Sequence, residues 1–200
     1  DPTANASSSI GEITLYNIYE TLTRINADGS VTPLLAESWE VSPDLKTYTF
    51  RLKRGVKFQN GEPFNAATVK FAFDRAAADK STNKDKRTFA NLSTQVVDDS
   101  TVVLINKEID PDFLFLLGQA TAIMVEPKSA DTNTTKPVGT GPYHPASCNK
   151  GASIALLQSP GFRQPAAIKI RPAPFKLISD PPPQTAAPPS GAVAVFVRVP

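Results

Sequence analysis

The sequence has one cysteine, Cys148, and one histidine, His144. A single cysteine cannot form a disulfide within the chain, so cysteine usage leaves the redox compartment open. Zinc sites need several cysteine or histidine ligands, which excludes a zinc site of that kind, and we expect no metal or other cofactor. The acidic stretches 98–99 and 110–112 lack the spacing and glycine of a calcium loop, so we interpret them as turn and capping residues.

Long apolar runs and strong net charge are also missing. The apolar stretch 113–125 is too short to span a bilayer and is interrupted by Gly118 and Gln119, which favours a buried element. The net charge of +2 over 200 residues gives no case for a nucleic-acid partner, and none is expected. No signal peptide is visible, because the chain opens on polar DPTANASSS, but a mature secreted protein would have lost one.

Catalytic motifs are scarce. The GTG at 139–141 has neither the further glycines nor the Lys-Ser/Thr of a phosphate-binding loop, and no Gly-x-Ser-x-Gly elbow occurs. The nearest nucleophile pair is His144 and Cys148, which are four positions apart with Pro145 between them. Such a pair works when the imidazole accepts the thiol proton. A thiol enzyme that uses this pair stays an alternative, but the site chemistry favours a protein that is not an enzyme.

Hydrophobic periodicity predicts a mixture of helices and strands. The unit 55–79 combines several signals: Val56 and Phe58 alternate with polar residues as in a strand, and Asn60-Gly61 is a tight-turn pair. Asn65 can then cap a helix that runs to about Asp79. The other predicted elements are a helix over 11–25, two strands within 33–58, a charged loop over 80–88, a hairpin over 93–107, a short helix within 110–120 that Asp110 begins, and three β-like stretches after residue 151.

The last third of the chain has a different composition. Residues 137–200 hold thirteen of the nineteen prolines, and Asp180 is their single carboxylate. The prolines of SDPPPQTAAPPSG, 179–191, exclude a helix there, since each interior proline costs about 3 kcal/mol.

Several motifs follow one another along the chain. They are Tyr-Glu-x-Leu at 19–22, Ala-Glu-Ser-Trp at 36–39, Tyr-x-Phe-x-Leu at 48–52, Gly-Val-x-Phe-x-Asn-Gly-x-Pro-Phe at 55–64, Val-x-Phe at 69–71 and Pro-x-Gly-Thr-Gly-Pro-Tyr at 137–143. With these motifs, residues 33–75 closely resemble the family 5 solute-binding proteins of ABC importers. Flanking matches extend the resemblance over most of residues 1–160, and it thins after that. Beyond residue 143 the sequence departs from the family, with Cys148 where relatives have Trp and Gly-Ala-Val-Ala at 191–194 where they have Gly-Asp-Val-Asp.

The resemblance implies an α/β fold: a periplasmic-binding-protein-like lobe with a mixed β-sheet, helices and an appended α+β subdomain. It assigns 1–20 and 139–200 to the core sheet of the lobe, and 21–138 to the appended subdomain. Family members are usually about two and a half times longer and have two lobes joined by a hinge. By this resemblance the chain corresponds to the first lobe alone, and the second lobe is absent.

The resemblance also implies a function. The protein would be the extracytoplasmic component of an ABC transporter, either periplasmic or a cell-surface lipoprotein. It would capture a peptide or similar small solute between two lobes and deliver it to a membrane permease, and we expect it to be monomeric. One lobe offers one wall of the cleft, so we expect weak or undetectable binding by these 200 residues. A structural fragment that binds no ligand is a further alternative.

Candidate ligand-binding residues follow from the resemblance and not from chemistry. They fall in three places: an N-terminal loop, an aromatic residue after the charged loop, and polar residues that interrupt an apolar run. The alternative interpretations are a solvated loop, a core phenylalanine and a helix end. The candidates are Ala6, Ser7, Ser8, Ser9, Phe89, Gln119, Ala120 and Thr121.

Overall fold

The computed structural model describes residue 3 and residues 8–149, 153–164, 173–178 and 195–198. Its elements alternate between helices and strands, and 3-10 helices are labelled η. In chain order they are α1 (Ser8–Thr14), β1 (Thr23–Ile25), β2 (Val31–Pro33), β3 (Ala36–Val41), β4 (Thr47–Leu52), α2 (Ala66–Ala77), α3 (Lys86–Ala90), β5 (Leu92–Asp98), β6 (Thr101–Asn106), α4 (Phe113–Leu116), η1 (Ala120–Ala122), η2 (Pro127–Thr132), β7 (Tyr143–Asn149), β8 (Ser153–Gln158), β9 (Ala173–Ile178) and β10 (Val195–Arg198).

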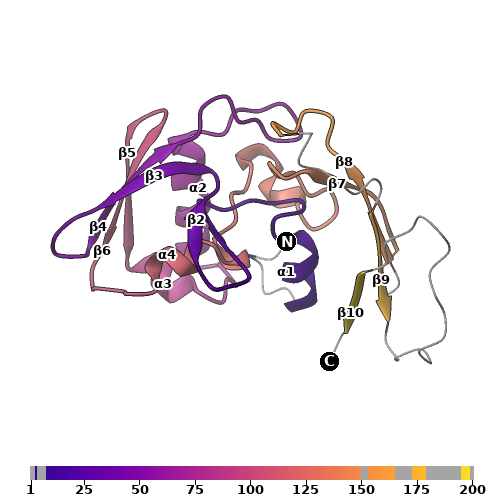
Figure 1. The fold of residues 1–200 in the computed structure, drawn as a ribbon, viewed down its shortest axis with the longest axis horizontal. Helices are drawn as coiled ribbons and strands as arrows, with labels where there is room; N and C mark the ends of the chain where they lie inside the picture. The colour runs from indigo at the N-terminus through magenta and orange to yellow at the C-terminus, as the bar shows by residue number, and fades with distance from the viewer. Residues whose placement is uncertain (1–2, 4–7, 150–152, 165–172, 179–194, 199–200) are drawn as a thin grey trace.

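Two four-stranded sheets organise the fold. The first has the order β3-β4-β6-β5 and is antiparallel throughout. The second has the order β10-β9-β8-β7 and is mixed, because β10 runs parallel to β9 while the other pairs are antiparallel. Figure 1 shows the two sheets toward opposite ends of the molecule, with α1 between them. The expected α/β lobe with a mixed sheet is confirmed.

The first sheet carries the strands that alternation predicted within 33–58. Trp39 of β3 pairs with Phe50 of β4, and their ring centroids are 6.0 Å apart. Tyr48, Phe50 and Leu52 alternate along β4 and are all buried. The hairpin over 93–107 is also present, as β5 and β6, with its turn at residues 99–100.

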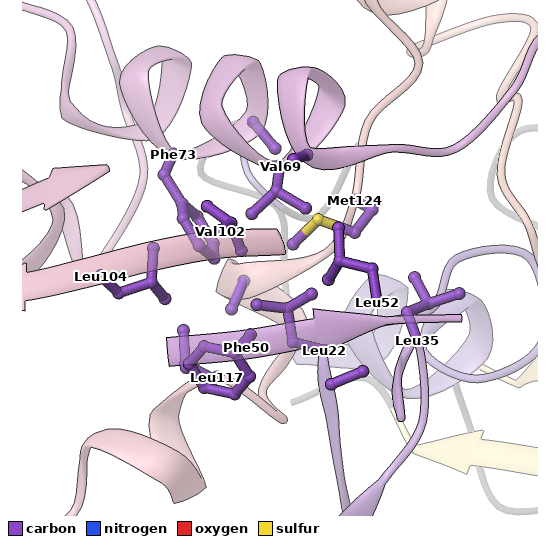
Figure 2. Close-up of a cluster of buried hydrophobic side chains, with 14 of the residues drawn as sticks. Leu22, Leu35, Phe50, Leu52, Val69, Phe73, Val102, Leu104, Leu117 and Met124 are labelled. Carbon is purple, nitrogen blue, oxygen red and sulfur yellow. The ribbon is translucent and has the colours of Figure 1, made fainter. Parts of the chain in front are cut away.

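Helix α2 covers this sheet and begins where the sequence predicted. Asn65 Oδ1 accepts from the Thr68 backbone N–H at 3.1 Å, and Thr68 Oγ1 accepts from the Asn65 N–H at 3.1 Å, which completes a capping box. The helix buries Val69, Ala72, Phe73 and Ala76. Figure 2 shows Val69 and Phe73 pointing from α2 toward the strand side chains Phe50 and Val102.

The strand expected at Val56–Phe58 is wrong in its extent. The backbone instead folds back on itself: Phe58 N–H donates to Glu62 O at 2.8 Å, and Gly61 N–H donates to Phe58 O at 2.9 Å. Gly61 has φ +87°, which a glycine adopts without strain. Only the single bridge Lys57–Pro63 forms in this unit, because so short a hairpin leaves no length for a strand. The predicted alternation of burial, with Val56 and Phe58 inside, is confirmed.

The helix expected over 11–25 is also wrong, since α1 ends at Thr14. Tyr16 has a positive φ of 61°, which no helix accommodates. The carbonyls of Asn17 and Ile18 accept from the backbone N–H groups of Tyr143 and Gly141, each at 2.9 Å. These residues therefore pair with a distant segment and not with the next helical turn.

Smaller differences concern the two short helices that follow. The expected loop over 80–88 contains the start of α3 at Lys86. Helix α4 begins at Phe113, later than predicted, and Asp110 Oδ1 accepts from the Asp112 N–H at 3.0 Å just before it. The predictions for 179–191 and for Gly191–Ala194 lie outside the described residues. Within the described part of the chain, no helix has the length and apolar character needed to cross a membrane.

Two hydrophobic cores stabilise the fold. The larger lies between α2 and the first sheet and includes Phe50, Val69, Phe73 and Leu104. The smaller combines Ile18 and Tyr19 with Tyr143 and Leu156 of the second sheet. Ile123, Val125 and Ala130 also belong to the smaller core, so the two cores meet through the segment around η1 and η2. The boundaries at residues 20 and 139 stay a prediction.

Candidate functional site

The elements that carry two of the three groups of candidate residues lie next to each other. Ser8 and Ser9 are the first residues of α1, whereas Ala6 and Ser7 lie outside the described residues. Gln119 is exposed and precedes η1, in which Ala120 and Thr121 are half-buried. Helix α1 packs on η1 so closely that a Cβ added to Gly11 would lie 3.3 Å from Ala120 Cβ. We call α1 and the segment 119–122 together the α1–η1 wall.

Phe89 is not part of this wall. Its side chain is 1% exposed and belongs to the larger core. The ring stacks on Phe73 of α2, with centroids 5.3 Å apart and planes 20° apart. In this structure Phe89 therefore takes the core position that the sequence left open as the alternative.

Tyr16, which lies within the stretch predicted as a helix, holds the segment before η1. Tyr16 Oη donates to Gly118 O at 2.7 Å and accepts from the Ile25 N–H at 2.9 Å. Gly118 has no room for a side chain, since a Cβ there would lie 2.8 Å from Ile25 Cγ1. A hydroxyl that both donates and accepts fixes the backbone at Gly118, directly before Gln119. The positive φ of Tyr16 aims the ring at this point.

Asn83 and Asp85 support the other side of the wall, and sequence reasoning missed both. Asn83 is buried, and its Nδ2 donates to Thr121 O at 2.9 Å. Thr121 Oγ1 donates to Asp85 Oδ2 at 2.5 Å. The Asp85 N–H donates to Asn83 Oδ1 at 2.8 Å, which is a local turn of the Asn-x-Asp sequence. That turn signal was present within the stretch interpreted as a charged loop, but its partner Thr121 is 36 residues away.

A glycine-rich crossing joins the wall's scaffold to the second sheet. A Cβ added to Gly139 would lie 2.0 Å from Ile18 O, and one added to Gly141 would lie 2.4 Å from Asn17 O. The glycines of the GTG at 139–141 are therefore required because two backbone segments are in contact at this point and leave no room for a Cβ.

A buried ion pair lies at the same crossing. Arg163 donates from Nη1 and Nη2 to the two carboxylate oxygens of Glu20, at 2.6 and 2.7 Å. Thr140 Oγ1 adds a third hydrogen bond to Glu20 Oε2 at 2.9 Å. Burial, and then the charge of Arg163, lower the pKa of the neighbouring Lys53 ammonium, which Glu20 and Glu37 oppose. The pair joins the segment between α1 and β1 to the loop after β8.

The polar groups at these places can take part in recognition. Among the described residues, no group of three or more His, Cys, Asp or Glu could hold a metal ion. His144 and Cys148 both lie in β7, paired with Leu157 and Ile154 of β8. At about 3.3 Å per residue, their Cα atoms are about 13 Å apart. The wall itself offers an amide, a hydroxyl and a carboxylate from Gln119, Thr121 and Asp85.

Comparison with known proteins decides the family. Residues 30–200 match the family model described as bacterial extracellular solute-binding proteins, family 5 Middle. The chain belongs to this family. The glutathione-binding protein GsiB of Salmonella choleraesuis (strain SC-B67) is 31% identical over 181 residues, covering 88% of this chain and 35% of that protein. GsiB of Escherichia coli (strain K12) is 29% identical over the same length.

Solved structures show the same fold for this family 5 protein. The binding protein AgaA from A. tumefacien R10, in complex with agropinic acid, superposes with a TM-score of 0.81 at 25% identity, covering 90% of this chain and 37% of AgaA. NikA from Brucella suis, in complex with Fe(III)-EDTA, gives 0.78 at 28% identity, covering 90% of this chain and 37% of NikA. The chain spans about a third of the length of the curated relatives it matches.

Proposed function

We propose that this family 5 protein is the substrate-binding component of an ABC importer, and that these residues are part of its first lobe. It captures a peptide or similar small solute and presents it to a membrane permease. The observation that supports the proposal is the contact of α1, which begins with Ser8 and Ser9, with η1, which the exposed Gln119 precedes. The relatives are named as binding proteins for glutathione and for agropinic acid.

We assign the ligand-contacting role to the α1–η1 wall. Ligand sites combine a preformed surface with a few placed polar groups. The wall meets this description because Tyr16, Asn83 and Asp85 fix the backbone and the hydroxyl of the η1 segment from two sides. Ala6 and Ser7 precede α1 directly and belong to the same proposal. Phe89 does not, because its ring is enclosed in the core.

An NMR titration of the isotope-labelled 200-residue chain with millimolar glutathione tests the assignment. We expect the shifted amide signals to map to residues 8–11 and 119–121. Gln119→Ala should weaken the response, because it removes the exposed amide of the wall. Gln95→Ala is the matched control, since Gln95 is an exposed glutamine on β5. Shifts confined to other residues, or equal loss in both variants, would contradict the assignment.

Division, location and assembly are part of the same proposal. Residues 1–20 with 139–200 form the core of the lobe and 21–138 the appended subdomain; the larger hydrophobic core supports this division, because its residues all lie between 22 and 138. The family description as extracellular supports a periplasmic or lipoprotein location, and we propose a monomer. Light scattering that gives a mass of 21.4 kDa would support the monomer, and twice that mass would contradict it.

We also propose that the protein is not an enzyme. The position of His144 and Cys148 along one strand favours this, because a thiol–imidazole hydrogen bond needs the two groups in contact. The expected result is slow labelling of Cys148 by iodoacetamide at neutral pH, at a rate that His144→Ala leaves unchanged. Fast labelling that depends on His144 would support the thiol enzyme instead.

A further inference from the structure

A cleft of about 530 Å³ lies apart from the α1–η1 wall. Three segments line it: the turn 57–61, the crossing loop 135–141, and the loop 159–162 after β8. Figure 1 shows the segment before α2 and the loop after β8 together at the upper edge of the molecule, while α1 lies lower. No residue of the wall lines this cleft, and neither the family assignment nor the proposed capture of solute uses it.

The floor of the cleft is built from one side chain. Gln59 Nε2 donates to Tyr143 O at 2.7 Å and to Ser159 Oγ at 3.2 Å, and Gln59 Oε1 accepts from the Gly139 N–H at 3.2 Å. The Ser159 N–H donates to Pro142 O at 2.8 Å. These bonds tie all three lining segments to one another, so the cleft exists before any ligand arrives.

The walls above this floor are mostly apolar. Phe58 is buried and fixed against Phe64, with ring centroids 6.3 Å apart. Phe162 is half-buried, and the Arg163 guanidinium lies 5.2 Å from its ring centroid. Further apolar lining comes from Pro137, Val138 and Pro160. A volume of several hundred Å³ with apolar walls is typical of sites that enclose small organic groups.

Among the described residues, the charged side chains that line the cleft are all basic. Lys57 and Lys136 are exposed at its rim, and neither forms an ion pair with another described residue. His144 also lines the cleft, and no aspartate or glutamate of the described part of the chain does. The nearest buried carboxylates are already engaged: Glu20 pairs with Arg163, and Glu126 accepts from Asn60 Nδ2 at 3.0 Å. An apolar cleft with an unpaired basic rim suits a ligand that is apolar at one end and anionic at the other.

We propose that this cleft binds an apolar group that carries a carboxylate, either as a small free acid or as the carboxyl-terminal end of a peptide. The apolar group packs against Phe162 and Val138, and the carboxylate lies between the ammonium groups of Lys57 and Lys136. The site is separate from the wall that we assign to the transported solute, so its occupation does not depend on that assignment.

The test is an NMR titration of the 200-residue chain with N-acetylphenylalanine and with its neutral amide, N-acetylphenylalaninamide. The two probes differ in the carboxylate alone. We expect signals of residues 57–61, 136–141 and 159–162 to shift, and the acid to bind about tenfold more tightly than the amide. Equal affinities for acid and amide, or shifts that avoid these residues, would overturn the proposal.

Charge variants distinguish the effect of the two rim lysines on affinity from a general effect of positive charge. The double variant Lys57→Gln with Lys136→Gln should lower the affinity for the acid to that for the amide and leave the amide unchanged. The control is Lys80→Gln with Lys84→Gln, which removes two exposed lysines that do not line the cleft. If the control loses the preference for the acid to the same extent, the proposal fails.

A third probe distinguishes the two sources of the carboxylate. N-acetyl-tetraalanyl-phenylalanine presents the same end group on a peptide. Tighter binding than N-acetylphenylalanine identifies a chain end as the natural ligand, and weaker binding identifies a small acid. Failure of both acids to bind at millimolar concentration would overturn the proposal for either source.

Discussion

Strand β4 places Tyr48, Phe50 and Leu52 in the larger core, and β6 adds Val102 and Leu104. In the second sheet, the strand residues whose burial is described contribute Tyr143 and Leu156 to the smaller core. The second sheet is joined to the rest of the chain by this smaller core, and by polar and backbone contacts at Gly139, Gly141 and the Glu20–Arg163 pair. The first region, which is the first sheet with α2, is therefore stabilised by apolar packing within itself. The second region, which is the second sheet, depends on its contacts with the rest of the chain.

This difference locates the family signature and the candidate sites. The signature residues of β4 and α2 pack inside the first region and identify the scaffold. Signature residues within 57–61 and 137–141 instead line the cleft with the basic rim. The α1–η1 wall and the basic cleft both lie along the segments that connect the two regions.

The largest expected effect is the removal of a ring from the larger core. Phe50→Ala should lower the free energy of unfolding by about 4 kcal/mol, because it removes a fully buried phenylalanine and leaves a cavity. Urea unfolding measures it. Phe115→Ala is the control, since that ring is 38% exposed, and should cost less than about 1 kcal/mol. Equal costs would show that the first region does not depend on this packing.

A change at the crossing should affect the second region selectively. Gly139→Ala forces a methyl group onto Ile18 O and should cost about 3 kcal/mol. Hydrogen exchange should show loss of protection in β7 and β8, while β4 and β6 remain protected. Gly161→Ala is the matched control, because a Cβ there meets nothing within 4 Å. Uniform loss of protection in all four strands would contradict a separable second region.

Loss of the ion pair should have a smaller effect at the same junction. Glu20→Gln leaves the Arg163 charge without its partner and should cost about 2 kcal/mol, less than for a fully buried pair because the Arg163 side chain is 19% exposed. The reference is Glu62→Gln at the exposed pair with Lys128, which should cost below about 1 kcal/mol. A double-mutant cycle with Arg163→Met measures the coupling energy of the two residues. A coupling energy of zero would contradict a stabilising role for the pair.

The smallest expected effect is a pH dependence of the stability of the first region. A backbone hydrogen bond from Ser100, and then a side-chain bond from Thr101, hold the pKa of the exposed Asp98 carboxyl below its ordinary value of 3.8. A lowered folded-state pKa adds stability that is complete above the ordinary value and is lost as pH falls through the folded value. Asp98→Asn removes this carboxyl, so the free energy of unfolding of the variant should fall less steeply with decreasing pH below pH 4.

The control for this measurement is Asp99→Asn, since the hydrogen bonds of the turn go to the Asp98 carboxylate. Asp28 and Asp44 lie in similar turns, where hydrogen bonds from Ser30 and Ser42 lower the pKa of each. An identical pH profile for both variants would contradict the assignment to Asp98.

Local patterns predicted the first region well. Alternation in β4, the Asn65 cap and the face of α2 all depend on residues within about ten positions of one another. The N-terminal helix failed for the opposite reason: Asn17 and Ile18 bond to Tyr143 and Gly141, more than a hundred residues later. Hydrophobic periodicity within a short stretch of sequence does not reveal such a distant hydrogen-bond partner.

The candidate site was partly predictable for the same reason. The resemblance indicated Ser8, Ser9 and Gln119 to Thr121 as candidates, and the structure shows that α1 and η1 are in contact at Gly11 and Ala120. It did not indicate Asn83 and Asp85, because their support of Thr121 depends on how the loop before α3 folds against η1. The Glu20–Arg163 pair spans 143 residues and leaves no local trace in the sequence.

Calorimetric titration of the 200-residue chain with glutathione and with a tripeptide tests the central claim most directly. A first lobe that supplies one wall of a cleft encloses little of the ligand, so we predict no saturable binding below the millimolar range. Sub-micromolar binding of either compound would contradict the account, because these residues would then form a complete site.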